Sequence, residues 1–139
     1  LLPIGTTIIS ARGTVGKCAI VGEPMAMNQS CYGVRGASGY RDYYIYYTIL
    51  LRVADLQQRG HGSVFNTITR DTFRSIKTVA CPSELSNSFD KAVQEFLDKI
   101  VANLRQIDSL AALRDTLLPK LLSGQLRIPD AEKQVAEAL

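Results

Sequence analysis

Hydrophobic positions in the first 80 residues form short β-branched runs and one helical stretch. Three runs bounded by turn residues predict short strands, at 6–9, 18–21 and 30–34. From Tyr40 to about Gln58, apolar residues recur at three- and four-residue steps, which predicts a helix. A short helical turn at 69–74 and a strand at 76–80 are expected to follow. This part of the chain therefore predicts a small domain of mixed α and β structure.

The rest of the chain carries one long apolar stripe. Asn87 followed by Asp90 is typical of an N-cap with an acid in the first turn, so we expect a helix from Asn87 to about Leu118. The stripe alternates four- and three-residue steps, as a heptad seam does. Its members are Phe89, Val93, Phe96, Ile100, Asn103, Ile107, Leu110, Arg114, Leu117 and Leu121. Pro119 is expected to kink or end the helix.

The length of this helix predicts how it is used. About 32 residues at ~1.5 Å each make a rod of roughly 48 Å. A compact chain of 139 residues has a diameter of roughly 37 Å. We therefore expect the helix to project and to pair through its stripe with a helix from outside this sequence. The polar Asn103 would then set the register of pairing. The alternative is a helix that lies across its own domain.

Composition excludes several classes of protein. A hydrophobic content of 46% and a charged content of 21% are those of a chain that buries a core. The longest uncharged stretches are about 11 residues, against the roughly 18 that a membrane helix needs. The opening residues lack an initiator Met and the pattern of a signal peptide, so we expect a fragment. Three widely spaced cysteines, at 18, 31 and 81, predict reduced thiols of a cytoplasmic protein and no metal site.

Charge is distributed unevenly along the chain. Residues 1–80 hold nine Lys or Arg and four Asp or Glu, a net charge of +5. Residues 81–139 hold seven basic and nine acidic side chains, a net charge of −2. A basic first part points to a polyanionic partner such as nucleic acid.

Nine residues of the first part are candidates for contact with nucleic acid. Cationic side chains in the turn between the first two strands, and on or after the 69–74 turn, suit phosphate groups. His61 lies between two glycines and, with its neighbours, could approach a base edge. The alternative for each is an ordinary solvated surface. The candidates are Arg12, Lys17, Arg59, His61, Ser63, Asn66, Arg70, Arg74 and Lys77.

Two other motifs have weaker functional interpretations. The run Gly13-Thr14-Val15-Gly16-Lys17-Cys18 differs from a nucleotide-binding phosphate loop, because Ala11 replaces its first glycine and Cys18 its magnesium-binding hydroxyl. A turn between strands is the better interpretation. The pair Asn28-Gln29 could read adenine, but we favour a structural role in hydrogen bonding to the backbone.

The linked order of these motifs resembles one known family. It runs from Gly5-x-x-Ile8-Ile9-Ser10 and Gly13–Lys17 through Asn28-Gln29, the tyrosine-rich helix, Gly62-Ser63, Cys81-Pro82-Ser83-Glu84 and the heptad helix to Leu117–Leu126. Across the whole chain, this resembles the specificity subunit of type I restriction–modification enzymes. That family carries two target recognition domains, each followed by a long helix, and the two helices pair antiparallel. The present chain resembles half of such a subunit.

The resemblance implies a non-enzymatic role in sequence-specific binding of double-stranded DNA. Methylation and cleavage would belong to a methyltransferase subunit and a restriction subunit, so no cofactor is expected on this chain. Two recognition domains roughly 48 Å apart would sit about one and a half turns of duplex apart. A fragment would form a homodimer through its helix. The alternative is a helix-mediated assembly module without DNA-binding activity.

The expected fold class is therefore α+β, a small mixed DNA-recognition domain followed by a long projecting coiled-coil helix. The expected divisions are a recognition domain at 1–82 that is incomplete at its start, a spacer helix at 83–124 and an extension at 125–139. The candidate helix-interface residues are Phe89, Val93, Phe96, Ile100, Asn103, Ile107, Leu110 and Leu117. No membrane partner is expected.

Overall fold

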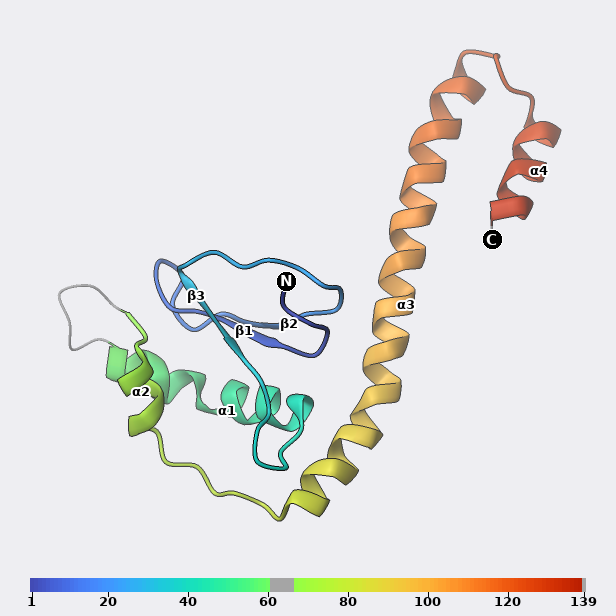
Figure 1. Cartoon of the computed structure of the whole chain (residues 1–139). Coiled ribbons are helices and arrows are strands. Elements are labelled where there is room, and N and C mark those ends of the chain that lie inside the picture. Colours follow the sequence, from blue (N-terminus) through green and yellow to red (C-terminus); the bar gives the residue numbers. More distant parts are fainter. Residues whose placement is uncertain (61–66, 139) are drawn as a thin grey trace. The chain divides into compact units, whose positions relative to one another are not determined.

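The computed structural model describes residues 1–60 and 67–138. The α+β fold class is confirmed (Figure 1). The strands are β1 (Thr7–Ser10), β2 (Cys18–Ile20) and β3 (Cys31–Val34). The helices are α1 (Asp42–Gly60), α2 (Arg70–Ser75), α3 (Ser83–Leu122) and α4 (Ile128–Ala138). The chain divides into two compact units, Leu1–Glu95 and Phe96–Leu139, and α3 contributes residues to both.

The sheet of the first unit is antiparallel, with β1 in the centre and the order β2-β1-β3. Thr7 of β1 is paired with Ile20 on one side and with Val34 on the other. Burial alternates along β1, so that Thr7 and Ile9 face the interior. The central strand therefore supplies one buried row of side chains.

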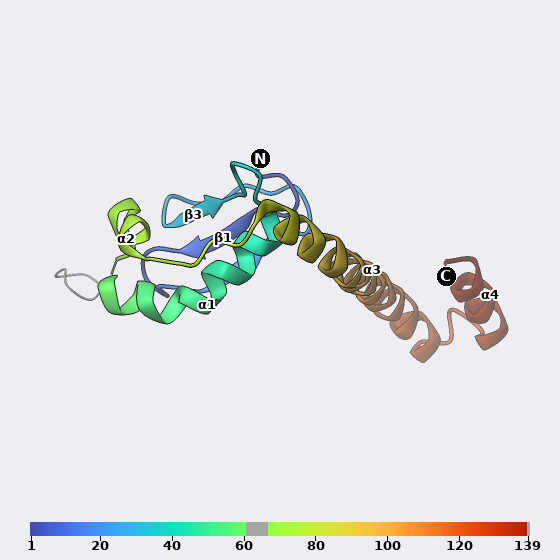
Figure 2. The same cartoon turned by 90° about the horizontal axis from the view of Figure 1, so that it is seen from below.

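α1 covers the buried row of the sheet (Figure 2). Ile49 and Leu56 are seven residues apart, which places them on one face of the helix, and both pack in the core with Ile9. Ala11 and Ile68 complete the buried cluster. The helical pattern at 40–58, which consists of Tyr43, Tyr46, Tyr47, Leu50, Leu51 and Ala54, therefore predicted this element but not its buried face, since Leu50 and Leu51 are 45% and 82% exposed.

The predicted strand at 76–80 is wrong. Ile76 packs against the core, but Val79 is 84% exposed and the segment runs as irregular chain. Among the described residues, no strand lies beside this segment to form a hydrogen-bonded ladder. A β-branched run becomes a strand only where a second strand supplies its hydrogen-bond partners.

The predicted N-cap of the long helix at Asn87 is also wrong, and Pro119 does not end the helix. α3 begins at Ser83, immediately after Pro82, whose carbonyl accepts the N–H groups of Leu85 and Ser86 at 3.0 and 3.2 Å. Asn87 is therefore inside the helix. Pro119 also lies inside, and the helix continues to Leu122. At the 40 residues of α3, a rise of ~1.5 Å per residue gives a length of about 60 Å.

α4 was not predicted, and it lies along the end of α3 in the second unit (Figure 1). Leu117 of α3 and Ala131 of α4 are both buried, at 7% and 6% exposure. The chain reverses through Gly124, which has a positive φ of 72°, and Leu126 donates its N–H to the carbonyl of Lys120. The two helices therefore form a hairpin.

Candidate nucleic-acid interface

The cationic candidates of the first unit lie on, or just after, three segments that hydrogen bonds hold together. The N–H of Ile68, just before α2, donates to the carbonyl of Ala11 in the β1–β2 connection at 3.0 Å. Gln57, near the end of α1, donates its Nε2 to the carbonyl of Val15 in the same connection at 2.8 Å. Figures 1 and 2 show this connection, the end of α1 and α2 at the same end of the unit.

This arrangement gathers positive charge at one end of the first unit, which we call the cationic end. Within the part of the chain that the structure describes, five exposed cations there form no ion pair. They are Arg12, Lys17, Arg59, Arg70 and Lys77. Unpaired, solvated cations are free to bind a polyanion without first breaking an internal contact.

Arg74 differs from these five because it has a partner. Its guanidinium lies 3.0 Å from the carboxylate of Asp71, and the two side chains are 80% and 86% exposed. Such a surface pair contributes little to stability and exchanges readily for another anion. His61, Ser63 and Asn66 lie outside the described residues, so their assignment to DNA contact stays a prediction.

Other cations of the first unit serve the fold. Arg35, at the end of β3, binds the carboxylate of Asp42 at 2.6 Å, and this contact raises the pKa of Arg35. The same carboxylate accepts the N–H of Gly36 at 2.7 Å. Arg41 donates its Nε to Asn87 of α3 at 2.8 Å. These side chains connect β3, α1 and α3, which separates them from the cationic end.

The first turns of α3 bind the N-terminus of α1. Asp90 accepts the N–H groups of Tyr43 and Tyr44 at 3.1 and 2.8 Å. Buried Ser86 accepts the N–H of Arg41 at 3.2 Å. The first N–H groups of a helix have no partner within the helix, and a carboxylate there also interacts favourably with the helix dipole. Asp90 therefore caps α1, whereas the sequence pattern had placed it in the first turn of its own helix.

Asn28 has a local structural role. Its side-chain oxygen accepts the N–H of Ser30 at 2.9 Å, and its carbonyl accepts the N–H of Cys31 at 3.3 Å. This Asx-type turn leads the chain into β3. The contact favours the structural interpretation of the Asn28-Gln29 pair.

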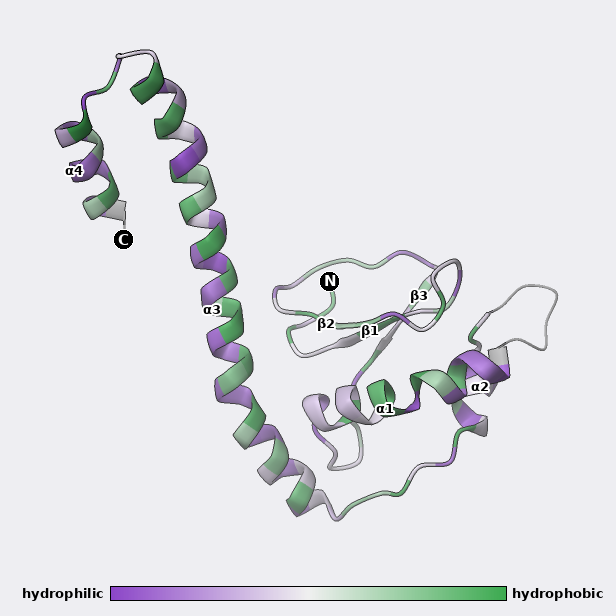
Figure 3. Ribbon diagram, turned by 180° about the vertical axis from the view of Figure 1, so that it is seen from behind, coloured by the Kyte–Doolittle hydropathy of each residue, from purple (hydrophilic) through white to green (hydrophobic). Residues whose placement is uncertain are grey.

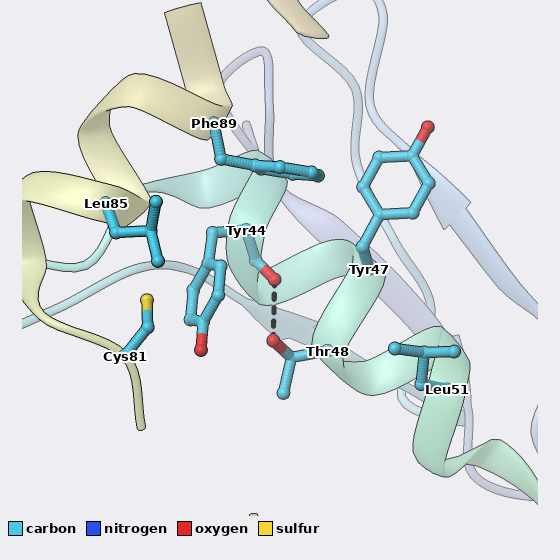
Figure 4. Close-up of a pocket in the computed structure, with 7 residues that line it drawn as sticks. All are labelled: Tyr44, Tyr47, Thr48, Leu51, Cys81, Leu85 and Phe89. Carbon is cyan, nitrogen blue, oxygen red and sulfur yellow. Dashed lines mark hydrogen bonds between the residues drawn. The ribbon is translucent and has the colours of Figure 1, made fainter. Parts of the chain in front are cut away.

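Phe89, the first member of the apolar stripe, is 36% exposed and packs against α1 at the surface of the first unit. Its ring meets those of Tyr44 and Tyr47 edge-on, at centroid distances of 6.3 and 5.6 Å. The three rings line a pocket of about 310 Å³ (Figure 4). Cys81 also lines it, and the hydrogen bond between the Tyr44 hydroxyl and the Cys81 side chain raises the pKa of Tyr44. Phe89 therefore contributes to the attachment of α3 to α1.

The stripe along the rest of α3 is largely exposed. Phe96 is 72% exposed, and Val93 is intermediate. Green and purple residues alternate along α3 in Figure 3, as the heptad spacing requires. The exposed members are Phe96, Ile100, Asn103, Ile107 and Leu110.

The last members of the stripe make contacts within the chain. Arg114 binds the neighbouring Asp115 at 2.8 Å, and this contact lowers the pKa of Asp115. Leu117 and Leu121 line a groove with Ile128 and Val135 of α4. α4 thus occupies part of the surface that the stripe pattern assigned to a partner helix.

Comparisons with known proteins show the family of this chain. The family model described as type I restriction modification DNA specificity domain matches residues 1–112. The chain therefore belongs to this family, as the order of its motifs had indicated.

Two curated relatives are specificity subunits. The chain is 27% identical over 90 residues to the type I restriction enzyme MjaIX specificity subunit of Methanocaldococcus jannaschii, covering 65% of this chain and 21% of that protein. It is 23% identical over 130 residues to the HindI specificity subunit of Haemophilus influenzae, covering 90% of this chain and 28% of that protein. The chain thus spans less than a third of either relative. No solved structure matches it significantly. None of the helices in residues 1–60 and 67–138 is long and apolar enough to cross a lipid bilayer.

Proposed function

We propose that this chain binds double-stranded DNA sequence-specifically, as the recognition part of a type I restriction–modification specificity subunit. Its partners would be the methyltransferase and restriction subunits of the same cytoplasmic system, which carry the catalysis. The observation that carries this proposal is the group of unpaired cations at the cationic end of a chain that belongs to the DNA specificity family.

The parts of the chain would divide this work. Residues 1–82 would bind DNA through Arg12, Lys17, Arg59, Arg70, Arg74 and Lys77, together with His61, Ser63 and Asn66. Residues 83–124 would form the spacer helix, and residues 125–139 the extension that folds onto its end. The exposed stripe supports pairing with a second helix, because a row of apolar side chains in water gains free energy by burial.

Selection of duplexes from a random pool tests the function directly. The chain is mixed with the methyltransferase subunit, and bound DNA is recovered and sequenced. Enrichment of a gapped palindrome is expected if two identical chains bind, because each would read the same half-site. A motif with unlike halves would indicate that a second recognition domain of a longer protein takes part. A pool that is not enriched beyond that of the methyltransferase alone would contradict sequence-specific recognition by this chain.

The second candidate function is a helix-mediated assembly module without affinity for DNA, and the exposed stripe favours it. Salt separates the two functions. For a DNA-binding chain, the logarithm of the binding constant falls linearly with the logarithm of the salt concentration, with a slope of about −0.9 per phosphate contact. An assembly module would self-associate with rising concentration and show no such slope.

Asn103 provides a test of the stripe. It is exposed on α3 between Ile100 and Ile107, where a paired helix would bury it. Replacing Asn103 with Leu should tighten self-association by about tenfold or more and loosen its register, since a buried polar residue lowers stability while it specifies alignment. Sedimentation equilibrium and thermal melting measure the change. Unchanged oligomeric state and melting temperature would show that the stripe is not the interface.

A further inference from the structure

The β1–β2 connection is closed on itself by Ser10. The N–H of Gly16 donates to the Ser10 carbonyl at 2.8 Å, and the N–H of Ser10 donates to the Lys17 carbonyl at 2.9 Å. The Ser10 hydroxyl accepts the N–H of Lys17 at 3.0 Å and donates to the carbonyl of Thr14. Residues 10–17 therefore form a loop of defined shape, which we call the Ser10 loop.

The Ser10 loop is also held from outside, by α1. The Nε2 of Gln57 donates to the carbonyl of Val15 at 2.8 Å. A Cβ on Gly16 would lie 2.8 Å from that Nε2, and Gly16 has a φ of +85°. Only glycine allows so close an approach in this conformation. The amide of Gln57 therefore occupies the space that a side chain at position 16 would fill.

The outer side of the Ser10 loop presents unused donors. Within the described residues, the backbone N–H groups of Arg12, Gly13, Thr14 and Val15 donate no hydrogen bond. Gly13 has a φ of +74°, and the space where its Cβ would lie is open. Successive free N–H groups around a residue of positive φ form a concavity that binds anions. The exposed Arg12 and Lys17 add two cationic side chains to the same loop.

We propose that the Ser10 loop binds one phosphate group of the DNA backbone, and that Gln57 is the positioning residue that holds the loop in its binding shape. This inference rests on the proposed function and adds to it a defined contact and a residue of α1. The bound group would be a diester phosphate of a duplex, because the neighbouring cations at the end of α1 and on α2 extend the charge beyond one phosphate.

Cys18 argues against a free nucleotide as the ligand. It directs its thiol to the carbonyl of Gly16 at 3.7 Å, and burial raises the pKa of this thiol. A neutral thiol turned into the loop offers no ligand for the magnesium ion that accompanies a nucleoside triphosphate.

Two neighbouring glutamines give a matched test. Gln57→Met removes the amide donor and keeps a side chain of similar length, whereas Gln58→Met makes the same change at an exposed position of α1. Binding of the full chain to a fluorescent 20-base-pair duplex is measured between 50 and 300 mM salt, with the melting temperature measured alongside. Arg12→Gln is included because it changes an exposed side chain that the fold does not use.

The expected result is a loss of about tenfold in affinity for Gln57→Met. The salt slope should fall by ~0.9 when the phosphate contact is lost. Arg12→Gln should have a similar effect, and the double variant should lose less than the sum of the two. Gln58→Met should bind as the unchanged protein does. If Gln57→Met unfolds the chain, the affinity and slope of Arg12→Gln alone decide whether the loop binds phosphate.

The contradicting results separate this inference from the proposed function. If the unchanged protein binds no duplex at any salt, the proposed function fails and this inference fails with it. If it binds and Gln57→Met equals Gln58→Met, only the role of Gln57 is overturned. If Arg12→Gln leaves the affinity and the slope unchanged, the loop does not bind phosphate. Saturable binding of ATP that Gln57→Met abolishes would assign the loop to a free nucleotide instead of a duplex.

Discussion

Replacing Arg12, Lys17, Arg70 and Lys77 together by Gln should lower the affinity for duplex DNA by about 1000-fold near 0.15 M salt. Each phosphate contact contributes ~0.9 to the salt slope, so the loss of one contact lowers the affinity about fivefold at that salt concentration. The slope should flatten by roughly 3.6 for the same reason. The four side chains are exposed and unpaired with other described residues, so the fold should remain intact.

The control for this prediction removes the same charge elsewhere. Lys91, Lys99, Lys120 and Lys133 are exposed residues of α3 and α4, and their replacement by Gln lowers the net charge equally. Binding of both variants is measured by fluorescence anisotropy across a range of salt concentrations. An equal loss in the two variants would mean that net charge, and not the cationic end, determines the affinity.

Replacing Asp90 by Ala should destabilise the first unit by about 2–3 kcal/mol. The change leaves the N–H groups of Tyr43 and Tyr44 without an acceptor and removes a negative charge from the N-terminus of α1. Asp90→Asn should lose about half as much, because an amide oxygen can still accept one hydrogen bond.

Urea unfolding followed by the near-ultraviolet circular dichroism of tyrosine measures this effect, because all 6 tyrosines lie between residues 32 and 47. Asp108→Ala is the matched control, since it removes an exposed carboxylate from the same helix. If Asp90→Ala and Asp108→Ala unfold at the same urea concentration, the capping of α1 by α3 does not contribute to stability.

Local patterns predicted most of the elements. The heptad spacing predicted α3 and its apolar stripe, and the three- and four-residue steps predicted that α1 is a helix. Both predictions follow from the periodicity of a helix, which can be recognised within a single segment of the sequence. The capping box of Thr69 and Thr72 similarly accounts for the short α2.

The failures share one physical cause, which is the choice of partner. Asn87 and Asp90 have the residue types and spacing of an N-cap. In the structure, however, Asn87 binds Arg41, and Asp90 binds the N-terminus of α1. Residues 76–80 have the composition of a strand but no neighbouring strand among the described residues. α4 lies beyond Pro119, where the sequence pattern predicted only a kink or the end of a helix.

The sequence and the tertiary structure likewise account for different parts of the candidate site. The excess of positive charge in residues 1–80 and the nine candidate residues came from the sequence. The gathering of Arg12, Lys17, Arg59 and Arg70 at one end depends on two hydrogen bonds between distant segments, from Ile68 to Ala11 and from Gln57 to Val15. Gln57 itself carries no sequence signal, because a glutamine near the end of a helix is ordinary.

The amino-acid sequence by itself determined most of the helical and extended segments, the apolar stripe of α3, the uneven charge and the family. These properties depend on residues close together in the chain, where periodicity and composition act directly. Only the tertiary structure decided that α3 caps α1, that α4 covers Leu117, and that Gln57 shapes the Ser10 loop. A polar side chain has several possible hydrogen-bond partners, and the one it binds is set by which distant segments packing brings within about 3 Å of it.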